Sequence, residues 1–255
     1  MSEEKKGTTR FSNRVDDYVK YRPSYPKEIV EFMGEKLGLS KESTVIDIGS
    51  GTGIFSEILL RNGNRVYGVE PNAEMRAAAE TLLSKYPRFK SIDGTAEKTS
   101  LPDHVADFII AAQAFHWFDQ EKTKLEFKRI LKPNGYVVLI WNIRKSGTPF
   151  QDDYEALIDR FGTDYRQVRE SNIVANDQIQ AFLGERNYGS TQFPNFQKFD
   201  FEGLKGRLFS TSYVPSRSDA RYHEMCVELK ELFDKYQENK TVIMEYDTLL
   251  YFAQI

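Results

Sequence analysis

A glycine-rich turn between an apolar run and a helical pattern constrains this chain more than any other feature. Residues 44–48 are a β-branched apolar run that ends directly in Gly49–Gly53. A helical pattern starts at Ile54 and stops near Asn62 and Gly63, a normal C-terminal stop signal. This order predicts a strand, a tight turn and a helix, whose first backbone N–H groups point at a ligand.

Strand-like and helical patterns alternate along the first half of the chain. The expected strands are 44–48, 65–70, 89–92, 107–112 and 136–141, and the expected helices are 54–62, 71–83 and 121–131. Such regular alternation predicts an α/β fold in which a parallel sheet carries helices on both faces.

The alternation stops after Trp141. Two helical patterns, about 151–161 and 176–183, are followed by a strand-like run at 197–201, helices at 204–209 and 219–236, and a final apolar segment at 241–252 that would close the sheet. We therefore divide the chain into an N-terminal cap segment (1–40), a cofactor-binding core (41–145), a helical lid or substrate insertion (146–195) and a C-terminal part that completes the sheet (196–255).

Composition limits the function classes. The 255 residues are 40% hydrophobic, enough for one large core or a core with a lid. The 35 basic and 38 acidic residues are nearly balanced, which does not favour a nucleic-acid partner. Apolar runs such as Tyr136–Trp141 are too short to cross a membrane, and the single Cys226 has no companions for a disulfide or a zinc cluster. We expect a cytoplasmic monomer or homodimer without membrane contact or bound metal.

The residues around the turn indicate the kind of cofactor. Glu70 ends the next strand, 21 residues after Gly49, where it can accept hydrogen bonds from two ribose hydroxyls. A dinucleotide site would have a third glycine where this chain has Ile54. Asp47 would be unfavourable beside a pyrophosphate but suits the cationic amine and sulfonium of S-adenosylmethionine. An NAD(P)-dependent oxidoreductase is therefore the less favoured alternative.

Three segments resemble the motifs of class I S-adenosylmethionine-dependent methyltransferases. They are Val45–Gly53, Val69–Met75 and Ile130–Tyr136, in the family's order and spacing, and the resemblance covers residues 40–145. It implies a Rossmann-like, doubly wound sheet of seven mostly parallel strands with an antiparallel last strand. It also implies S-adenosylmethionine as the cofactor.

The resemblance carries over to individual residues that bind the cofactor. It implies Asp47, Gly49, Gly51 and Gly53 around the methionine part, Glu70 on the ribose, Pro71 and Met75 beside the adenine, and Ala96 with Thr95 or Glu97 at the adenine edge. In related enzymes an N-terminal segment caps the cofactor, which implies Tyr21 and Arg22 near the methionine carboxylate and Tyr18 beside the acceptor. The alternative is that these three side chains only cover apolar surface.

The segment after the 107–112 strand should face the reacting methyl group. This segment, Gln113–Asp119, resembles a subgroup of small-molecule methyltransferases that act on carboxylic acids. We expect Gln113 to contact both the cofactor and the reacting atoms, and Trp117 to contact the acceptor. An alcohol or phenol would need a general base, for which His116 is the candidate, whereas a carboxylate needs none. His116 is equally well explained as a structural residue of an aromatic cluster.

The second half of the chain supplies further acceptor candidates. Leu208–Pro215 is similar to the same subgroup, in which Ser212 and Tyr213 would line the acceptor pocket. Arg144, Arg207 and Arg217 are each able to hold a carboxylate through two hydrogen bonds, or to lie on the surface.

The sequence thus predicts methyl transfer from S-adenosylmethionine to a small-molecule acceptor, at a carboxylate or hydroxyl oxygen. The alternatives are a methyltransferase acting on protein or nucleic acid, an oxidoreductase, and a cofactor-binding module without catalysis. A base-flipping nucleic-acid enzyme is disfavoured because Gln113 and the residues after it lack the Asn/Asp-Pro-Pro-aromatic run.

Overall fold

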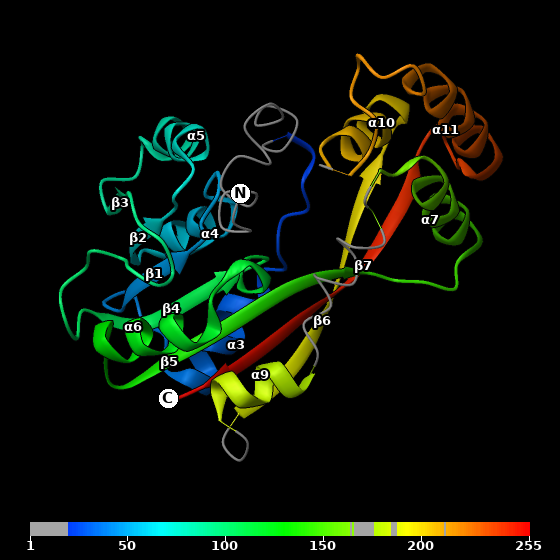
Figure 1. The fold of residues 1–255 in the computed structure, drawn as a ribbon. Helices are drawn as coiled ribbons and strands as arrows, with labels where there is room; N and C mark the ends of the chain where they lie inside the picture. The colour runs from blue at the N-terminus through cyan, green and yellow to red at the C-terminus, as the bar shows by residue number, and fades with distance from the viewer. Residues whose placement is uncertain (1–19, 164, 166–175, 185–187, 212) are drawn as a thin grey trace.

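The computed structural model describes residues 20–163, 165, 176–184, 188–211 and 213–255. A seven-stranded sheet forms its centre (Figure 1). The strands are β1 (Thr44–Ile48), β2 (Arg65–Val69), β3 (Phe89–Ile92), β4 (Ala106–Ala112), β5 (Leu131–Arg144), β6 (Tyr188–Phe199) and β7 (Val242–Ala253). They lie in the order β3-β2-β1-β4-β5-β7-β6.

The pairing confirms a mostly parallel sheet with an antiparallel last strand. The first five strands pair in parallel, whereas β7 runs antiparallel to both β5 and β6, between which it lies. The strand order reverses between β1 and β4, and ligands of such sheets bind at the carboxyl ends of the strands at this switch point.

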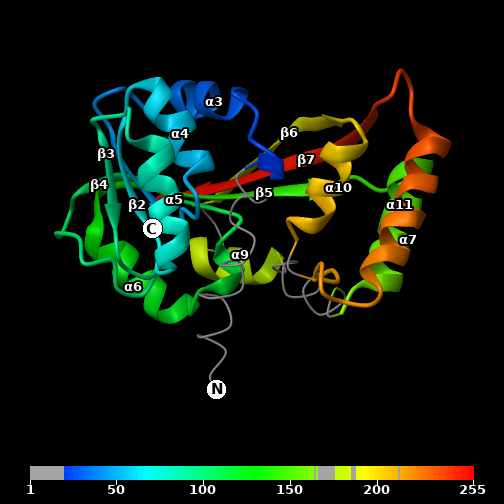
Figure 2. The same cartoon turned by 90° about the horizontal axis from the view of Figure 1, so that it is seen from above.

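Helices cover both faces of the sheet, as the alternation predicted. Figure 2 shows α3 (Glu28–Leu37) and α4 (Ile54–Asn62) on one side of it, and α6 (Gln120–Ile130) and α9 (Asn176–Leu183) on the other. Successive residues of β1 serve different cores: Val45 packs with the α3 and α4 side chains, and Ile46 packs with those of α6 and α9. A further helix, α5 (Ala73–Leu83), follows β2.

A second, helical unit forms around the far ends of the long strands. β5, β6 and β7 have 14, 12 and 12 residues and reach past the other strands (Figure 1). There α7 (Pro149–Phe161), α10 (Phe201–Phe209) and α11 (Tyr222–Tyr236) share a separate apolar core. Met244 and Tyr246 of β7 belong to this core. The same strands therefore connect the two cores.

The elements of the expected insertion 146–195 are divided between these two units. Helix α7 packs in the helical unit, whereas α9 packs on the sheet near Phe115 and Phe127. Strand β6 begins at Tyr188, nine residues before the expected strand, so the boundary at 195/196 falls within it. The polar residues and Pro194 of β6 interrupt the apolar pattern by which a strand is recognised. An edge strand tolerates such residues because one of its sides needs no hydrogen-bonding partner.

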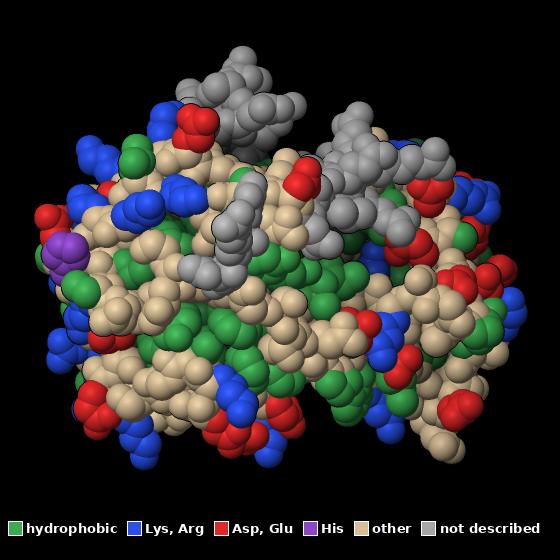
Figure 3. All heavy atoms as spheres, turned by 90° about the horizontal axis from the view of Figure 1, so that it is seen from below, with side chains coloured by type: hydrophobic (Ala, Val, Ile, Leu, Met, Phe, Trp, Pro, Cys, Tyr) green, Lys and Arg blue, Asp and Glu red, His purple; other side chains and the backbone are tan. Residues whose placement is uncertain are grey.

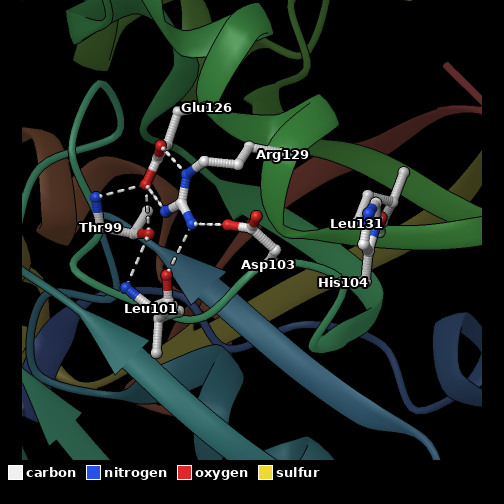
Figure 4. Close-up of polar contacts among 7 residues, drawn as sticks. All are labelled: Thr99, Leu101, Asp103, His104, Glu126, Arg129 and Leu131. Atoms are coloured by element: carbon white, nitrogen blue, oxygen red, sulfur yellow. Dashed lines mark hydrogen bonds and ion pairs between the residues drawn. The ribbon is translucent and has the colours of Figure 1, made fainter.

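An ion-pair network fixes the loop between β3 and β4 (Figure 4). Glu126 of α6 accepts hydrogen bonds from the backbone N–H of Thr99, at 2.8 Å, and from the Thr99 hydroxyl. Arg129 donates to Glu126, to Asp103 and to the carbonyl oxygen of Leu101. The Arg129 hydrogen bond lowers the pKa of Glu126 to about 2. The network holds the loop that carries the expected adenine-edge residues against α6.

Candidate functional site

The glycine turn leaves free space at one position. Gly49, Gly51 and Gly53 have φ angles of +65°, +56° and +86°, a region that favours glycine. A Cβ atom at Gly49 would lie 2.6 Å from Cβ of Ala114, and one at Gly53 would lie 2.6 Å from Cδ1 of Leu83. At Gly51 no atom of the described residues, apart from its chain neighbours, lies within 4 Å of the added Cβ. Two glycines thus allow close packing, and Gly51 faces an opening.

A cavity lies at this opening, beside the carboxyl ends of β1 and β4. Its lining residues are Tyr25, Asp47, Gly49, Ser50, Gly51, Thr52, Ile54, Phe55, Ala112 and Gln113. This is the switch point of the sheet, where a ligand of a doubly wound fold is expected. Four of these positions were predicted as site residues from the sequence, and six were not: Tyr25, Ser50, Thr52, Ile54, Phe55 and Ala112. Ser50 and Thr52 belong to the glycine turn itself, which is a signal that could have found them.

Glu70 connects the end of β2 to the glycine turn. Its Oε2 accepts a hydrogen bond from the backbone N–H of Gly51 at 3.0 Å, and its Oε1 accepts one from Asn72 at 2.8 Å. Burial raises the pKa of this carboxyl, while the two N–H groups and Arg76 act in the opposite direction. The carboxylate is held in a fixed orientation, as recognition of a ribose requires.

Asp47 is a buried carboxyl group in the wall of the cavity. Only 1% of the residue is exposed. Burial raises its pKa to about 7, the negative charge of Glu70 acts in the same direction, and the hydrogen bond from Ser56 opposes both. A positive charge in the cavity would favour the ionised form. The position therefore suits a cationic ligand.

The expected adenine contacts lie near the start of α5 and in the β3–β4 loop. Met75 and Ala96 are buried, and Pro71 and Thr95 are half-buried. The side chain of Glu97 accepts a hydrogen bond from the backbone N–H of Asp119 at 2.9 Å, which links this loop to the segment after β4. None of these five residues lines the described cavity.

Gln113 joins the cavity to β5. Its backbone has a φ of +58°, and its Nε2 donates a hydrogen bond to the carbonyl oxygen of Asn142 at 3.1 Å. The Asn142 side chain is in turn held by Thr248 and by the carbonyl oxygen of Ser24. Asn142, at the carboxyl end of β5, was not singled out from the sequence, although its place after an apolar strand is a signal for such a residue.

His116 lies in a short 3-10 helix, η2 (Phe115–Trp117), and does not line the cavity. The residue is half-buried, and its Nδ1 atom is enclosed and has no hydrogen-bond partner within the described part of the chain. Burial lowers its pKa to about 4. Such an imidazole is neutral at pH 7 and a weak base. Its neighbour Trp117 is 41% exposed, with ring centroids 4.8 Å apart.

The N-terminal candidates also lie away from the cavity. The ring of Tyr21 covers Gly206 of α10, where an added Cβ would come within 2.1 Å of it. Arg22 donates a hydrogen bond to the carbonyl oxygen of Ser210 at 3.4 Å. Instead Tyr25, four residues after Tyr21, lines the cavity and packs edge-on against Phe55, with ring centroids 5.0 Å apart. Whether Tyr21 or Tyr25 faces the cavity depends on the direction that the chain takes before the sheet, and the sequence motif alone does not fix that direction.

Of the expected acceptor contacts, Tyr18 and Ser212 lie outside the described residues. Tyr213 lies in the helical unit beside Tyr165, with ring centroids 4.7 Å apart. Among the three arginines, Arg144 and Arg207 are enclosed there, whereas Arg217 is exposed.

The cavity has the properties that an adenosyl cofactor with a cationic methionine group requires. Gly51 leaves room for a ligand, and the hydroxyl of Thr52 is enclosed without a partner among the described residues. Asp47 supplies a buried acid for a cation, and Glu70 supplies fixed acceptors for ribose hydroxyls. These residues fit S-adenosylmethionine.

Comparison with known proteins agrees with the geometry. A family model described as a methyltransferase domain matches residues 46–139. The chain is 31% identical to an uncharacterized methyltransferase of Schizosaccharomyces pombe over 228 residues, covering 87% of this chain and 86% of the relative. The protein belongs to the class I S-adenosylmethionine-dependent methyltransferases. A probable S-adenosylmethionine-dependent methyltransferase of Saccharomyces cerevisiae is 27% identical over 76% of this methyltransferase and 66% of its own length.

Solved structures share the fold of this methyltransferase. One from Anaeromyxobacter dehalogenans has a TM-score of 0.65 at 20% identity, covering 92% of this chain and 98% of its own. Phosphoethanolamine N-methyltransferase 2 of Haemonchus contortus, in complex with S-adenosylmethionine, has a TM-score of 0.58 at 15% identity and is covered over 60% of its length.

Two further observations concern the described part of this methyltransferase. No helix in it combines the length and apolar character needed to cross a membrane. No group of three or more His, Cys, Asp or Glu side chains within it is arranged to hold a metal ion.

Proposed function

We propose that this methyltransferase binds S-adenosylmethionine in the cavity at the glycine turn and methylates a small molecule at a carboxylate or hydroxyl oxygen. The observation that carries the proposal is the arrangement around Gly51. Its N–H binds the Glu70 carboxylate, and its missing side chain leaves the opening into which Asp47 faces.

Residues in the cavity wall and next to it would divide the recognition of the cofactor between them. Glu70 would accept hydrogen bonds from the ribose hydroxyls, and Asp47 would balance the positive charge of the methionine part. Met75 and Pro71, at the start of α5, would border the adenine. The backbone at Gly51 would approach the ligand closely because it carries no Cβ.

When bound, the cofactor supplies an electrophilic methyl group on a sulfonium. The protein then has to align the acceptor atom and exclude water. Gln113 is the residue suited to this alignment, because its side chain is fixed on Asn142 at the rim of the cavity. A carboxylate acceptor is ionised at neutral pH and needs no base, which agrees with the weak basicity of His116.

The surface supports a small acceptor over a nucleic acid. On the face shown in Figure 3, lysine and arginine side chains are interspersed with aspartate and glutamate. The formal net charge of the chain is −3. A polyanionic partner usually requires a continuous basic patch.

Calorimetric titration tests the proposal directly. The wild type is titrated with S-adenosylmethionine, S-adenosylhomocysteine and NADH, and then so is Glu70→Ala, with Glu74→Ala on the exposed side of α5 as its control. We expect the adenosyl compounds alone to bind, and Glu70→Ala to weaken binding by about 5- to 150-fold, the effect of about 1–3 kcal/mol from a lost charged acceptor.

Binding of NADH alone would overturn the cofactor assignment. Equal affinity of Glu70→Ala and Glu74→Ala would refute the ribose contact. If the cofactor binds, a screen of small carboxylic acids and phenols for methyl transfer tests the acceptor class, and a protein or nucleic-acid acceptor methylated in preference to all of them would refute that part.

A further inference from the structure

A cluster of arginine and tyrosine side chains lies inside the helical unit, apart from the cofactor cavity. Arg144 comes from the end of β5 and Arg207 from α10. Three tyrosines accompany them. Arg207 donates a hydrogen bond to the hydroxyl of Tyr246 of β7, and both guanidinium groups act to lower the pKa of Tyr154 of α7 and of Tyr213. We call these five residues the arginine–tyrosine cluster.

The two guanidinium groups keep unused donors in this enclosed place. Nη2 of Arg144 donates to Glu155 at 2.8 Å and to the Tyr165 hydroxyl at 2.9 Å, but its Nη1 has no partner within the described residues. Arg207 is 4% exposed; its Nε donates to the Tyr246 hydroxyl at 3.3 Å, and its Nη1 is likewise unpartnered there.

Such donors are costly unless something accepts their hydrogen bonds. A buried charged group without a partner destabilises the fold, and apolar residues of similar volume would often be more stable at the same place. Within the described residues, the ion pair made by these two guanidinium groups joins Arg144 to Glu155. The planar guanidinium matches carboxylate and phosphate oxygens with two parallel hydrogen bonds. A ligand that matches these donors therefore has the chemistry of an oxyanion.

The direction of the pKa shift of Tyr213 agrees with a positive electrostatic field in the cluster. Burial alone would raise the pKa of this phenol. The guanidinium groups of Arg144, Arg207 and Arg22 outweigh the burial, and the pKa is lowered. An anion entering the cluster would experience the same field as the phenolate.

Two chain segments connect the cluster with the cofactor cavity. Gln113, in the wall of the cavity, is bonded to Asn142, and Arg144 is two residues further along β5 on the same side of the strand, about 7 Å away. Arg22, which acts on Tyr213, is three residues before Tyr25, another wall residue. Each of these two segments thus carries one residue of the cavity wall and one that acts in the cluster.

We propose that the arginine–tyrosine cluster, together with Arg22, binds an oxyanion of the methyl acceptor and leaves a second group of that molecule facing Gln113. The acceptor class is thus a bifunctional acid, anchored by one carboxylate or phosphate and methylated elsewhere. The methyl-transfer part rests on the proposed function, whereas the anion binding does not.

The test measures anion binding without methyl transfer. Succinate, benzoate and inorganic phosphate are titrated into the wild type by calorimetry, and tyrosinate absorbance is followed against pH with and without each anion. We expect one or more of these probes to bind and to raise the pKa of Tyr213, identified by the difference from Tyr213→Phe. The pattern among the probes distinguishes a carboxylate anchor from a phosphate anchor.

Variants assign the binding to the cluster. We expect Arg207→Met and Arg144→Met to weaken anion binding at least about tenfold, and Arg207→Lys to weaken it less because it keeps the charge but not the planar fork. Arg217→Met, at an exposed arginine of the same half, should bind as the wild type does. The cofactor affinity of all four should be unchanged.

The outcomes separate this proposal from the proposed function. Cofactor binding without binding of any anion overturns the cluster site alone, as does equal anion affinity in Arg207→Lys, Arg144→Met and Arg217→Met. Anion binding that depends on Arg207 in a protein that fails to bind the adenosyl compounds supports the cluster and overturns the proposed function. The Tyr213 titration is made on protein that keeps both arginines. It therefore tests anion binding at the cluster even if Arg207→Met does not fold.

Discussion

The hydroxyl of Ser56 donates a hydrogen bond to Oδ2 of Asp47 at 2.6 Å, in a place where both side chains are buried. This bond favours the ionised carboxyl, but burial outweighs it and the pKa of Asp47 rises to about 7. A residue in the wall of the cofactor cavity is therefore expected to titrate near neutral pH.

Cofactor affinity should depend on pH through Asp47. Below its pKa the carboxyl is neutral, so a cationic ligand has to displace a proton, and the dissociation constant should rise about tenfold per pH unit as the pH falls below 7. Calorimetry between pH 5 and 7.5 measures this slope. In Asp47→Asn the affinity should be lower at pH 7.5 and nearly independent of pH; a slope equal to that of the wild type would rule out Asp47 as its cause.

The same residue should destabilise the ligand-free protein at high pH. The folded-state pKa, about 7, lies above the reference value of 3.8, so the stability contribution is present at low pH and is lost as the pH rises to about 7. As the pH rises from 5 to 8, the free energy of unfolding of Asp47→Asn should increase by about 2–3 kcal/mol relative to that of the wild type. Urea unfolding at both pH values measures this difference. Asp234→Asn, on the exposed face of α11, is the control and should not show the increase.

Gly51→Ala and Gly53→Ala should fail in different ways. Both place a Cβ on a residue whose φ is positive, which is unfavourable. Only the Cβ at position 53 also collides with a neighbour, Leu83. We expect Gly53→Ala to lose more stability than the roughly 1 kcal/mol of Gly51→Ala. Gly51→Ala should mainly lose cofactor affinity, because its methyl group enters the cavity. Thermal unfolding and calorimetry separate the two effects, and wild-type cofactor affinity in a folded Gly51→Ala would show that no ligand approaches there.

His116 should remain neutral through the physiological pH range. Burial holds its pKa at about 4, so its ring NMR signals, assigned with His116→Gln, should not titrate between about pH 5.5 and 8. Because this pKa lies below the reference value of 6.5, His116 should also destabilise the fold as the pH falls from 6.5 towards 4. A midpoint near 6.5 would contradict the burial and restore His116 as a candidate base.

The core of the fold could be predicted because local signals agree with one another. Asn72 caps α5 through its side chain, glycines end α3 and α4, and the apolar runs of β1 and β4 match their burial on both faces. Strand β6 could not be read in the same way. Its alternating half-exposed residues become a strand only because the 12-residue β7 lies beside it.

Sequence spacing by itself determined the glycine turn, Asp47 and Glu70, because these residues are fixed by the strands and helices next to them in the chain. Tertiary structure alone decided that Tyr25 rather than Tyr21 lines the cavity, and that Nδ1 of His116 is enclosed. It also decided that Nη1 of Arg144 and Nη1 of Arg207 are enclosed while Arg217 is exposed. The physical reason is that burial and electrostatic environment depend on which distant segments pack together. A pattern of neighbouring residues does not contain those contacts.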